Sequence, residues 1–152
     1  MQRQPLADYE FWFVVGSQFL YGKETLDQVA AHAQIMVQRM NASGLLPCKL
    51  VYKATVKTPE EIEQCVKEAN YNDACAGLIT WMHTFSPSKM WIRGLEILQK
   101  PYCHLHTQFN RTIPDTEIDM DFMNLNQSAH GDREHAFIAA RMHTKRKIIT
   151  GF

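Results

Sequence analysis

Several features by which function is most easily recognised are missing from this sequence. Sixteen Lys and Arg residues balance sixteen Asp and Glu residues, so no net positive charge favours nucleic acid as a partner. No apolar run is long enough to span a membrane, and the N-terminus contains no apolar segment of the kind that directs secretion. We therefore expect a soluble, cytoplasmic protein that binds neither nucleic acid nor membrane.

The common catalytic and binding motifs are missing as well. The four cysteines contain no C-x-x-C pair, so neither a zinc ribbon nor a dithiol redox motif is indicated. There is no G-x-G-x-x-G, no P-loop spacing and no G-x-S-x-G. The turn "GSQFLYGKET" resembles a phosphate-binding loop only loosely, and we interpret it as a plain strand-to-helix connection.

A regular alternation of short apolar runs and helical patterns is present instead. The apolar runs predict strands at 10–16, 48–56, 75–83 and 101–109, and "KRKIITGF" begins a fifth. Helical spacing of apolar residues predicts one helix within the stretch 24–44, one after Thr58 and one after Pro87. The same spacing predicts a last helix that ends at about Met142. This alternation predicts an α/β fold: a doubly wound, flavodoxin-like parallel sheet of four to five strands with helices on both faces.

Capping residues predict where three of the helices begin. Thr58 and Glu61 form the T-x-x-E pattern of a capping box, and Thr25 and Gln28 form a similar one. Ser128 has the side chain of an N-cap for the last helix. We therefore expect helices to start directly after Thr25, Thr58 and Ser128.

The length of 152 residues is that of one domain, which we expect to span residues 1–152. No helix follows the beginning of the fifth strand, which would leave one face of the sheet partly uncovered. We therefore expect a domain truncated at the start of its fifth strand, or one completed by a partner.

Polar residues follow the predicted strands where each strand ends. They are Ser17 and Gln18, then His83 and Thr84 ahead of the aromatic Phe85, then His106 to Gln108, and after a loop Asn124, Asn126, Gln127 and His130. The carboxyl ends of parallel strands share one edge of the sheet, which is where ligands bind. Amides, hydroxyls and imidazoles with few carboxylates suit a neutral polyol or sugar better than a divalent cation. A structural role in satisfying buried backbone groups explains His83 and His106 equally well.

The stretch "HGDREH" (130–135) has the residue types of a metal or acid/base cluster, and also those of an ordinary helix start. On one helix His130 and His135 lie about 140° apart, so together with Asp132 they cannot face one ion. Acidic side chains near the start of a helix complement its dipole. We therefore interpret Asp132 to His135 as a helix start, and expect Phe137, Ile138 and Ala140 to begin the buried face.

Five blocks of the sequence resemble the N-terminal region of the bacterial L-arabinose isomerases. They are "WFVVGSQFLYG" (12–22), "LPCKLV" (46–51), "CAGLITWMHTFSPSKMW" (75–91), "HTQFN" (106–110) and "IDMDFMNLNQSAHGDRE" (118–134). They occur in the order and spacing of that family and cover nearly the whole chain from about Tyr9.

The resemblance implies an aldose–ketose isomerase that interconverts L-arabinose and L-ribulose, often with slow conversion of D-galactose. Enzymes of that family use a divalent metal, commonly Mn²⁺, held by two glutamates and two histidines in later domains that no segment here resembles. The resemblance therefore implies neither a catalytic residue nor a metal ligand in this chain, and we expect the chain alone to be inactive.

The resemblance also implies a homo-oligomer, typically a hexamer, in which this domain covers the active site of a neighbouring subunit. The residues that match the family's substrate-binding positions are Gln18, Leu20, Tyr21, Phe85, Gln127 and His130. The first three would line the sugar pocket, and the last three would reach the sugar across a subunit boundary.

The alternative is a stand-alone flavodoxin-like module that binds a sugar or a nucleotide without catalysis. A receiver domain is less consistent with the sequence, because the first strand ends in Gly-Ser-Gln and not in acidic residues. A flavin site needs aromatic loops beside a phosphate turn, for which Tyr21 and Phe85 are the candidates.

Overall fold

A computed structural model describes residues 6–85, 87–115 and 118–151 of the chain. The elements, in chain order, are β1 (Glu10–Gly16), η1 (Phe19–Tyr21), α1 (Gly22–Ala42), β2 (Lys49–Val56), α2 (Pro59–Tyr71), β3 (Cys75–Met82), η2 (Ser88–Trp91), α3 (Ile92–Ile97), β4 (Tyr102–His106), α4 (Met120–Leu125), α5 (Ser128–Arg141) and β5 (Lys147–Thr150). None of the helices in these ranges is both long enough and apolar enough to cross a membrane.

The five strands form one sheet in the order β2-β1-β3-β4-β5, and every neighbouring pair is parallel. This is the flavodoxin-like order, so the predicted fold class is confirmed. The chain leaves β1 toward β2 and then returns to the other side of β1 to form β3. The direction of winding thus reverses between β1 and β3, and the carboxyl ends of these two strands flank the switch point.

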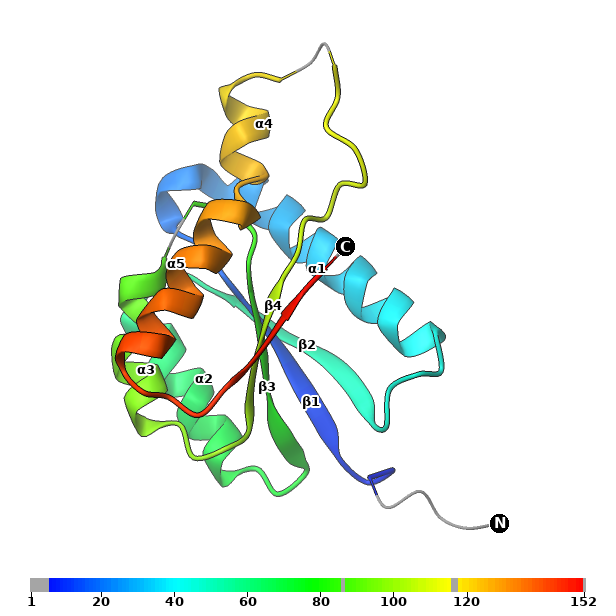
Figure 1. The fold of residues 1–152 in the computed structure, drawn as a ribbon, viewed down its shortest axis with the longest axis vertical. Coiled ribbons are helices and arrows are strands. Elements are labelled where there is room, and N and C mark those ends of the chain that lie inside the picture. Colours follow the sequence, from blue (N-terminus) through cyan, green and yellow to red (C-terminus); the bar gives the residue numbers. More distant parts are fainter. Residues whose placement is uncertain (1–5, 86, 116–117, 152) are drawn as a thin grey trace.

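Alternate residues of the central strand β1 contribute to two separate cores. Trp12 and Val14 pack with residues of α2, α3 and α5, whereas Phe13 and Val15 pack with residues of α1. Successive side chains of a strand point to opposite faces, so a continuous apolar run becomes a strand covered on both sides. Figure 1 shows α1 on one face of the sheet and α2, α3 and α5 on the other.

Local capping explains one helix start as predicted. The Thr58 hydroxyl accepts a hydrogen bond from the Glu61 N–H at 3.1 Å, and α2 begins at the next residue, Pro59. The Glu61 carboxylate reaches back to the N–H of Lys57, at 2.7 Å, one residue before the position a capping box uses.

The other two predicted caps are wrong. Helix α1 begins at Gly22, so Thr25 lies inside its first turn, and η1 leads directly into it. Ser128 is the first residue of α5 and not its N-cap, which is Gln127. The turn η1 precedes the start of α1, and a hydrogen bond from Gln127 to the His83 carbonyl holds the start of α5. Neither feature is part of the capping pattern on which the prediction was based.

The segment before α5 contains a helix that the sequence reading missed. α4 has Asp119 as its N-cap, whose carboxylate accepts from the Phe122 N–H at 2.7 Å. It projects beyond the carboxyl edge of the sheet, at the top of Figure 1. β5 lies at the outer edge of the sheet, and all four of its residues are exposed.

Candidate functional site

The loops after β1 and β3 are joined directly at the switch point. The hydroxyls of Ser17 and Thr84, both fully buried, lie 3.0 Å apart, and the Gln18 side chain donates to the Phe85 carbonyl at 3.3 Å. Tyr21 also hydrogen-bonds to this loop, through the Phe85 backbone and the Thr84 side chain; its partial burial raises its pKa, and these bonds oppose that rise. The crevice between the two strands is therefore closed by bonds between its own walls.

An aromatic stack extends this group onto α5. The rings of Phe85 and His130 are parallel within 19°, with centroids 4.2 Å apart. His130 is 43% exposed, and its Nε2 lies 3.6 Å from the carboxylate of Glu134. The N–H of Gln127 donates to the His83 carbonyl at 3.0 Å, which holds the start of α5 against the end of β3.

The six residues matched by resemblance therefore lie in one place. Gln18, Tyr21, Phe85 and His130 are linked by the bonds and the stack above. Gln127 is the N-cap of the helix that carries His130, and Leu20 lies in η1 with 71% of its surface exposed. Three segments that are far apart in the sequence supply them. Their arrangement offers amides, an imidazole and aromatic faces at the carboxyl edge, where strand topology predicts a ligand site.

Two hollows flank α4 beside this group. One, of about 290 Å³, has Gln127 in its wall together with Gln108, Asn110 and apolar residues of α4. The other, of about 530 Å³, is lined by Tyr21 and the start of α1 on one side and by Asp121 and Phe122 on the other. Two of the candidate substrate residues, Gln127 and Tyr21, thus each border open space beside α4.

His83, at the end of β3, has the structural role that the sequence left open. It is fully buried, stacks on Trp81 with ring centroids 4.2 Å apart, and has Nε2 2.8 Å from Nδ1 of His32. Its Nδ1 lies 3.3 Å from the hydroxyl of Ser128. Burial, together with the neighbouring His32, lowers the pKa of His83 to about 3, so the imidazole is neutral at physiological pH.

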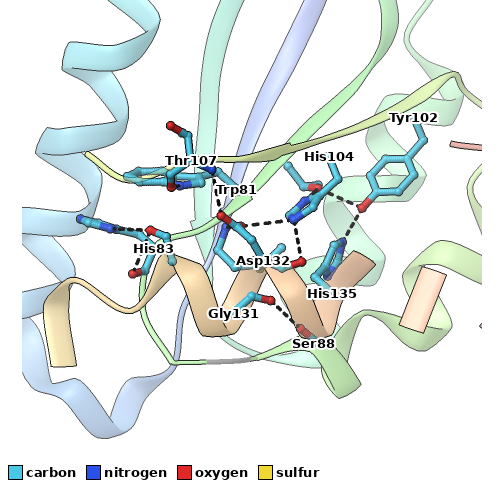
Figure 2. A network of polar contacts seen from close by, with 12 residues as sticks. Trp81, His83, Ser88, Tyr102, His104, Thr107, Gly131, Asp132 and His135 are labelled. Carbon is cyan, nitrogen blue, oxygen red and sulfur yellow. Dashed lines mark hydrogen bonds and ion pairs between the residues drawn. The ribbon is translucent and has the colours of Figure 1, made fainter. Parts of the chain in front are cut away.

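Asp132 lies at the centre of a buried polar network that the sequence reading missed (Figure 2). Its carboxylate, which is not exposed to solvent, accepts from the Met82 N–H at 2.8 Å and from the Thr107 N–H at 3.2 Å. His104 Nε2 lies 3.2 Å from the same carboxylate. Burial raises the pKa of Asp132, while His104 and the Met82 N–H act in the opposite direction.

The network continues from His104 to the next turn of the buried face of α5. His104 Nδ1 lies 2.9 Å from the Thr80 hydroxyl, which lies 2.9 Å from the Tyr102 hydroxyl. The Tyr102 hydroxyl in turn contacts Nε2 of His135. Burial lowers the pKa of His135 well below its usual value, so His135 is a neutral member of the core.

These contacts correct the interpretation of the charged stretch 130–135. Asp132 and His135 do more than start a helix, because both are fully buried and hydrogen-bonded in the core. Phe137 is 60% exposed where a buried face was expected. The buried residues of α5 are Ser128, Gly131, Asp132, His135 and Ala139. These residues have helical spacing in the sequence. None of them has a large apolar side chain, so the pattern did not predict that they form the buried face of the helix.

The described residues bring no metal site together. Within 6–85, 87–115 and 118–151, no group of three His, Cys, Asp or Glu side chains is placed so that it could hold an ion. Asp132, the acidic residue of the buried network, is occupied by two backbone N–H groups and His104. The donor set therefore does not fit a divalent cation.

Several known proteins are similar to this chain in sequence. A family model described as the L-arabinose isomerase N-terminal domain matches residues 5–152. The chain is 61% identical over 146 residues to the L-arabinose isomerase of Geobacillus kaustophilus, and the match covers 96% of this chain and 29% of that protein. It is 60% identical over 146 residues to the L-arabinose isomerase of Herpetosiphon aurantiacus, and the match covers 96% of this chain and 29% of that protein. It is 59% identical over 147 residues to the L-arabinose isomerase of Levilactobacillus brevis, and the match covers 97% of this chain and 31% of that protein.

The chain thus spans about three-tenths of the length of the curated relatives it matches. The match covers nearly all of the chain and includes every element of the candidate site. On this evidence the chain belongs to the L-arabinose isomerase family, as its N-terminal domain.

Proposed function

We propose that this chain acts in the isomerisation of L-arabinose to L-ribulose by presenting the sugar-facing edge of the active site. Gln18, Leu20, Tyr21, Phe85, Gln127 and His130 contact the substrate or line its pocket. The observation that carries the proposal is the contiguity of these residues, held together by the Gln18–Phe85 hydrogen bond and the Phe85–His130 stack. The identity of about 60% to enzymes named L-arabinose isomerase supports the choice of sugar.

The chemistry of the group suits recognition better than bond breaking. Amide and imidazole groups hydrogen-bond to sugar hydroxyls, and an aromatic face packs against sugar C–H groups. These residues orient the open-chain sugar and exclude water from it. They offer no pair of carboxylates for acid/base catalysis, so the proton transfer between adjacent carbons is assigned to residues outside this chain.

The proposal assigns the divalent metal, Mn²⁺ by resemblance to the family, to residues outside this chain too. Such an ion would supply Lewis-acid polarisation of the sugar. Since the described residues of this chain do not fit it, the contribution of this domain is to cover the metal-bearing part of the site.

Exposed apolar residues around the group support contact with another subunit. Phe19 is 60% exposed, Leu20 71% and Met120 66%, all at the same edge of the sheet. Grouped apolar exposure of this kind marks interaction surfaces. In this proposal the domain packs over a neighbouring subunit in a cytoplasmic homo-oligomer, a hexamer as in the family, and D-galactose is a second, slower substrate.

A stand-alone nucleotide-binding module is less well supported. In that role a phosphate would occupy the crevice between β1 and β3, where Ser17 bonds Thr84 and Gln18 bonds Phe85. Binding would have to break both contacts. Nucleotide or flavin titration of the chain is expected to give no saturable binding.

The test is a chimera in which this chain replaces the segment of the Geobacillus kaustophilus enzyme to which it aligns. We expect Mn²⁺-dependent formation of L-ribulose by the chimera and none by the 152-residue chain alone. In the chimera, Gln127→Ala and His130→Ala should each lower kcat/KM by roughly tenfold or more, the loss of one to two substrate hydrogen bonds. Lys67→Ala, on the exposed side of α2, is the matched control.

A folded chimera that assembles like the parent enzyme but forms no L-ribulose would refute the proposal. Full activity in both the Gln127 and the His130 variants would refute the assigned residues while leaving the activity in place.

A further inference from the structure

Asp132 fills a gap between two strands of the sheet. β3 and β4 are paired only where Leu78–Thr80 face Tyr102–His104, although β3 runs on to Met82. Beyond the paired region, the N–H groups of Met82 and Thr107 both donate to the Asp132 carboxylate, at 2.8 and 3.2 Å. A side chain from α5 therefore replaces the missing strand-to-strand connection, as Figure 2 shows.

We propose that Asp132 is a positioning residue for the sugar-facing group: it fixes the start of α5 against the ends of β3 and β4, and thereby sets where Phe85, Gln127 and His130 stand. The proposal rests on the proposed function for its effect on the substrate. The placement of Phe85, Gln127 and His130 by Asp132 is argued only from contacts within this chain.

The site requires a carboxylate. Two backbone N–H groups point at it from two strands, and a carboxylate offers an acceptor oxygen to each without presenting a donor. An asparagine amide would accept from one N–H and turn its own NH₂ toward the other. A buried donor left without an acceptor opposes the contact, so the amide cannot hold both strand ends.

The residue before Asp132 shows how closely α5 approaches the sheet. A Cβ at Gly131 would lie 2.6 Å from the Thr84 carbonyl oxygen and 3.0 Å from Cβ of Met82. Because the nearest atom belongs to the backbone, no rotation of a side chain relieves this contact. Gly131 and Asp132 thus act together: the glycine permits the approach, and the carboxylate binds the strand ends once α5 is there.

The same turn of α5 carries the candidate substrate residues. Gln127 donates its N–H to the His83 carbonyl at 3.0 Å, and the His130 N–H donates to the Gln127 carbonyl at 3.1 Å. His130 then stacks on Phe85, which follows β3. A shift of α5 along the sheet moves Gln127 and His130 together and separates the two rings.

Asp132 itself cannot touch the sugar. It follows His130 by two positions, about 200° around the helix, and its side chain is fully buried while that of His130 is 43% exposed. Any effect of Asp132 on the substrate therefore passes through the residues on the opposite side of the helix.

The first experiment needs no variant. In the chain labelled with ¹⁵N and ¹³C, NMR should detect scalar couplings through hydrogen bonds from the Met82 and Thr107 amides to Cγ of Asp132. Absence of both couplings in the folded chain overturns the proposal, whether or not any variant folds.

The second experiment compares Asp132→Asn with Asp73→Asn, an exposed aspartate just before β3. In the chain, Asp132→Asn should move the ring-proton signals of His130 toward those of a Phe85→Leu variant, in which the stack is gone. In the chimera described above, it should lower kcat/KM by about ten- to a hundredfold, mainly through KM, at temperatures where it is fully folded. Asp73→Asn should change neither.

The outcomes separate this proposal from the proposed function. If the unsubstituted chimera is inactive, the proposed function fails, and the couplings and His130 signals still decide whether Asp132 positions the group. If the chimera is active but Asp132→Asn changes only the melting temperature, with KM and the His130 signals unaltered, Asp132 is merely structural and the positioning role is refuted.

Discussion

Lowering the pH should destabilise this domain through His83. The imidazole is fully buried between Trp81 and His32, and burial lowers its folded-state pKa to about 3. In the unfolded chain its pKa is about 6.5. Between these values the unfolded state binds a proton that the folded state does not, so stability falls as the pH falls and is fully present above the unfolded pKa.

The size of the effect follows from the two pKa values. Between pH 7 and pH 5 a histidine with an unfolded pKa of about 6.5 and a folded pKa near 3 costs about 2 kcal/mol of unfolding free energy. That is a large part of the 5–15 kcal/mol typical of a domain. His135, also neutral and buried, acts in the same direction, whereas Asp132, whose pKa burial raises, acts against it.

A difference between variants isolates His83 from these other groups. Urea unfolding at pH 7 and pH 5 should show that His83→Phe, which keeps a ring against Trp81, loses about 2 kcal/mol less than the unsubstituted chain over this interval. Thr25→Ala, inside α1 and without a titratable side chain, provides the control, and its pH dependence should match the parent. Equal losses in His83→Phe and the parent would refute the assignment of a neutral, buried His83.

Three further predictions concern stability at pH 7, each read by urea unfolding. Tyr102→Phe leaves buried partners of its hydroxyl unsatisfied and should lower the unfolding free energy by about 1–3 kcal/mol. In a His135→Leu background the same substitution should lower it by about 1 kcal/mol less. Additive losses would contradict the hydrogen bond between Tyr102 and His135. Thr58→Ala should cost about 1 kcal/mol and Thr25→Ala, inside α1, under half of that; equal losses would contradict the cap. Gly94→Ala, whose Cβ would lie 2.6 Å from an Ile62 methyl group, should cost about 1–3 kcal/mol, with Gly151→Ala, open on all sides, as the neutral control.

The fold could be predicted correctly because the sequence patterns that indicate it are local and occur in every strand and most helices. Each strand is a short apolar run between polar turns, and each run is long enough for its β-structure to be recognised without knowledge of its neighbours. The three tryptophans, Trp12, Trp81 and Trp91, are buried as expected of large apolar side chains. Alternation of strands and helices then restricts the topology to few choices, of which the observed order is one.

The candidate site was partly accessible from sequence for the same reason. Strand ends in a parallel sheet lie at one edge whatever the details, so Gln18, Phe85 and the residues near Gln127 could be assigned to a common rim. The stack of Phe85 on His130 could not be assigned, because it depends on the angle at which α5 crosses the sheet.

Asp132 shows most clearly what the chain order alone leaves undecided. By composition, an aspartate in the first turns of a helix is ordinarily a solvated residue that complements the helix dipole. Its burial depends on two N–H groups that become available only because β3 and β4 separate beyond Thr80 and His104. The sequence by itself determined the strands, most of the helices, the rim on which the polar residues lie and the family to which they point. Only the tertiary structure decided which of those polar residues stay accessible at the rim and which are buried and hold the sheet together, since burial and hydrogen-bonding partners arise from segments that meet in space and not along the chain.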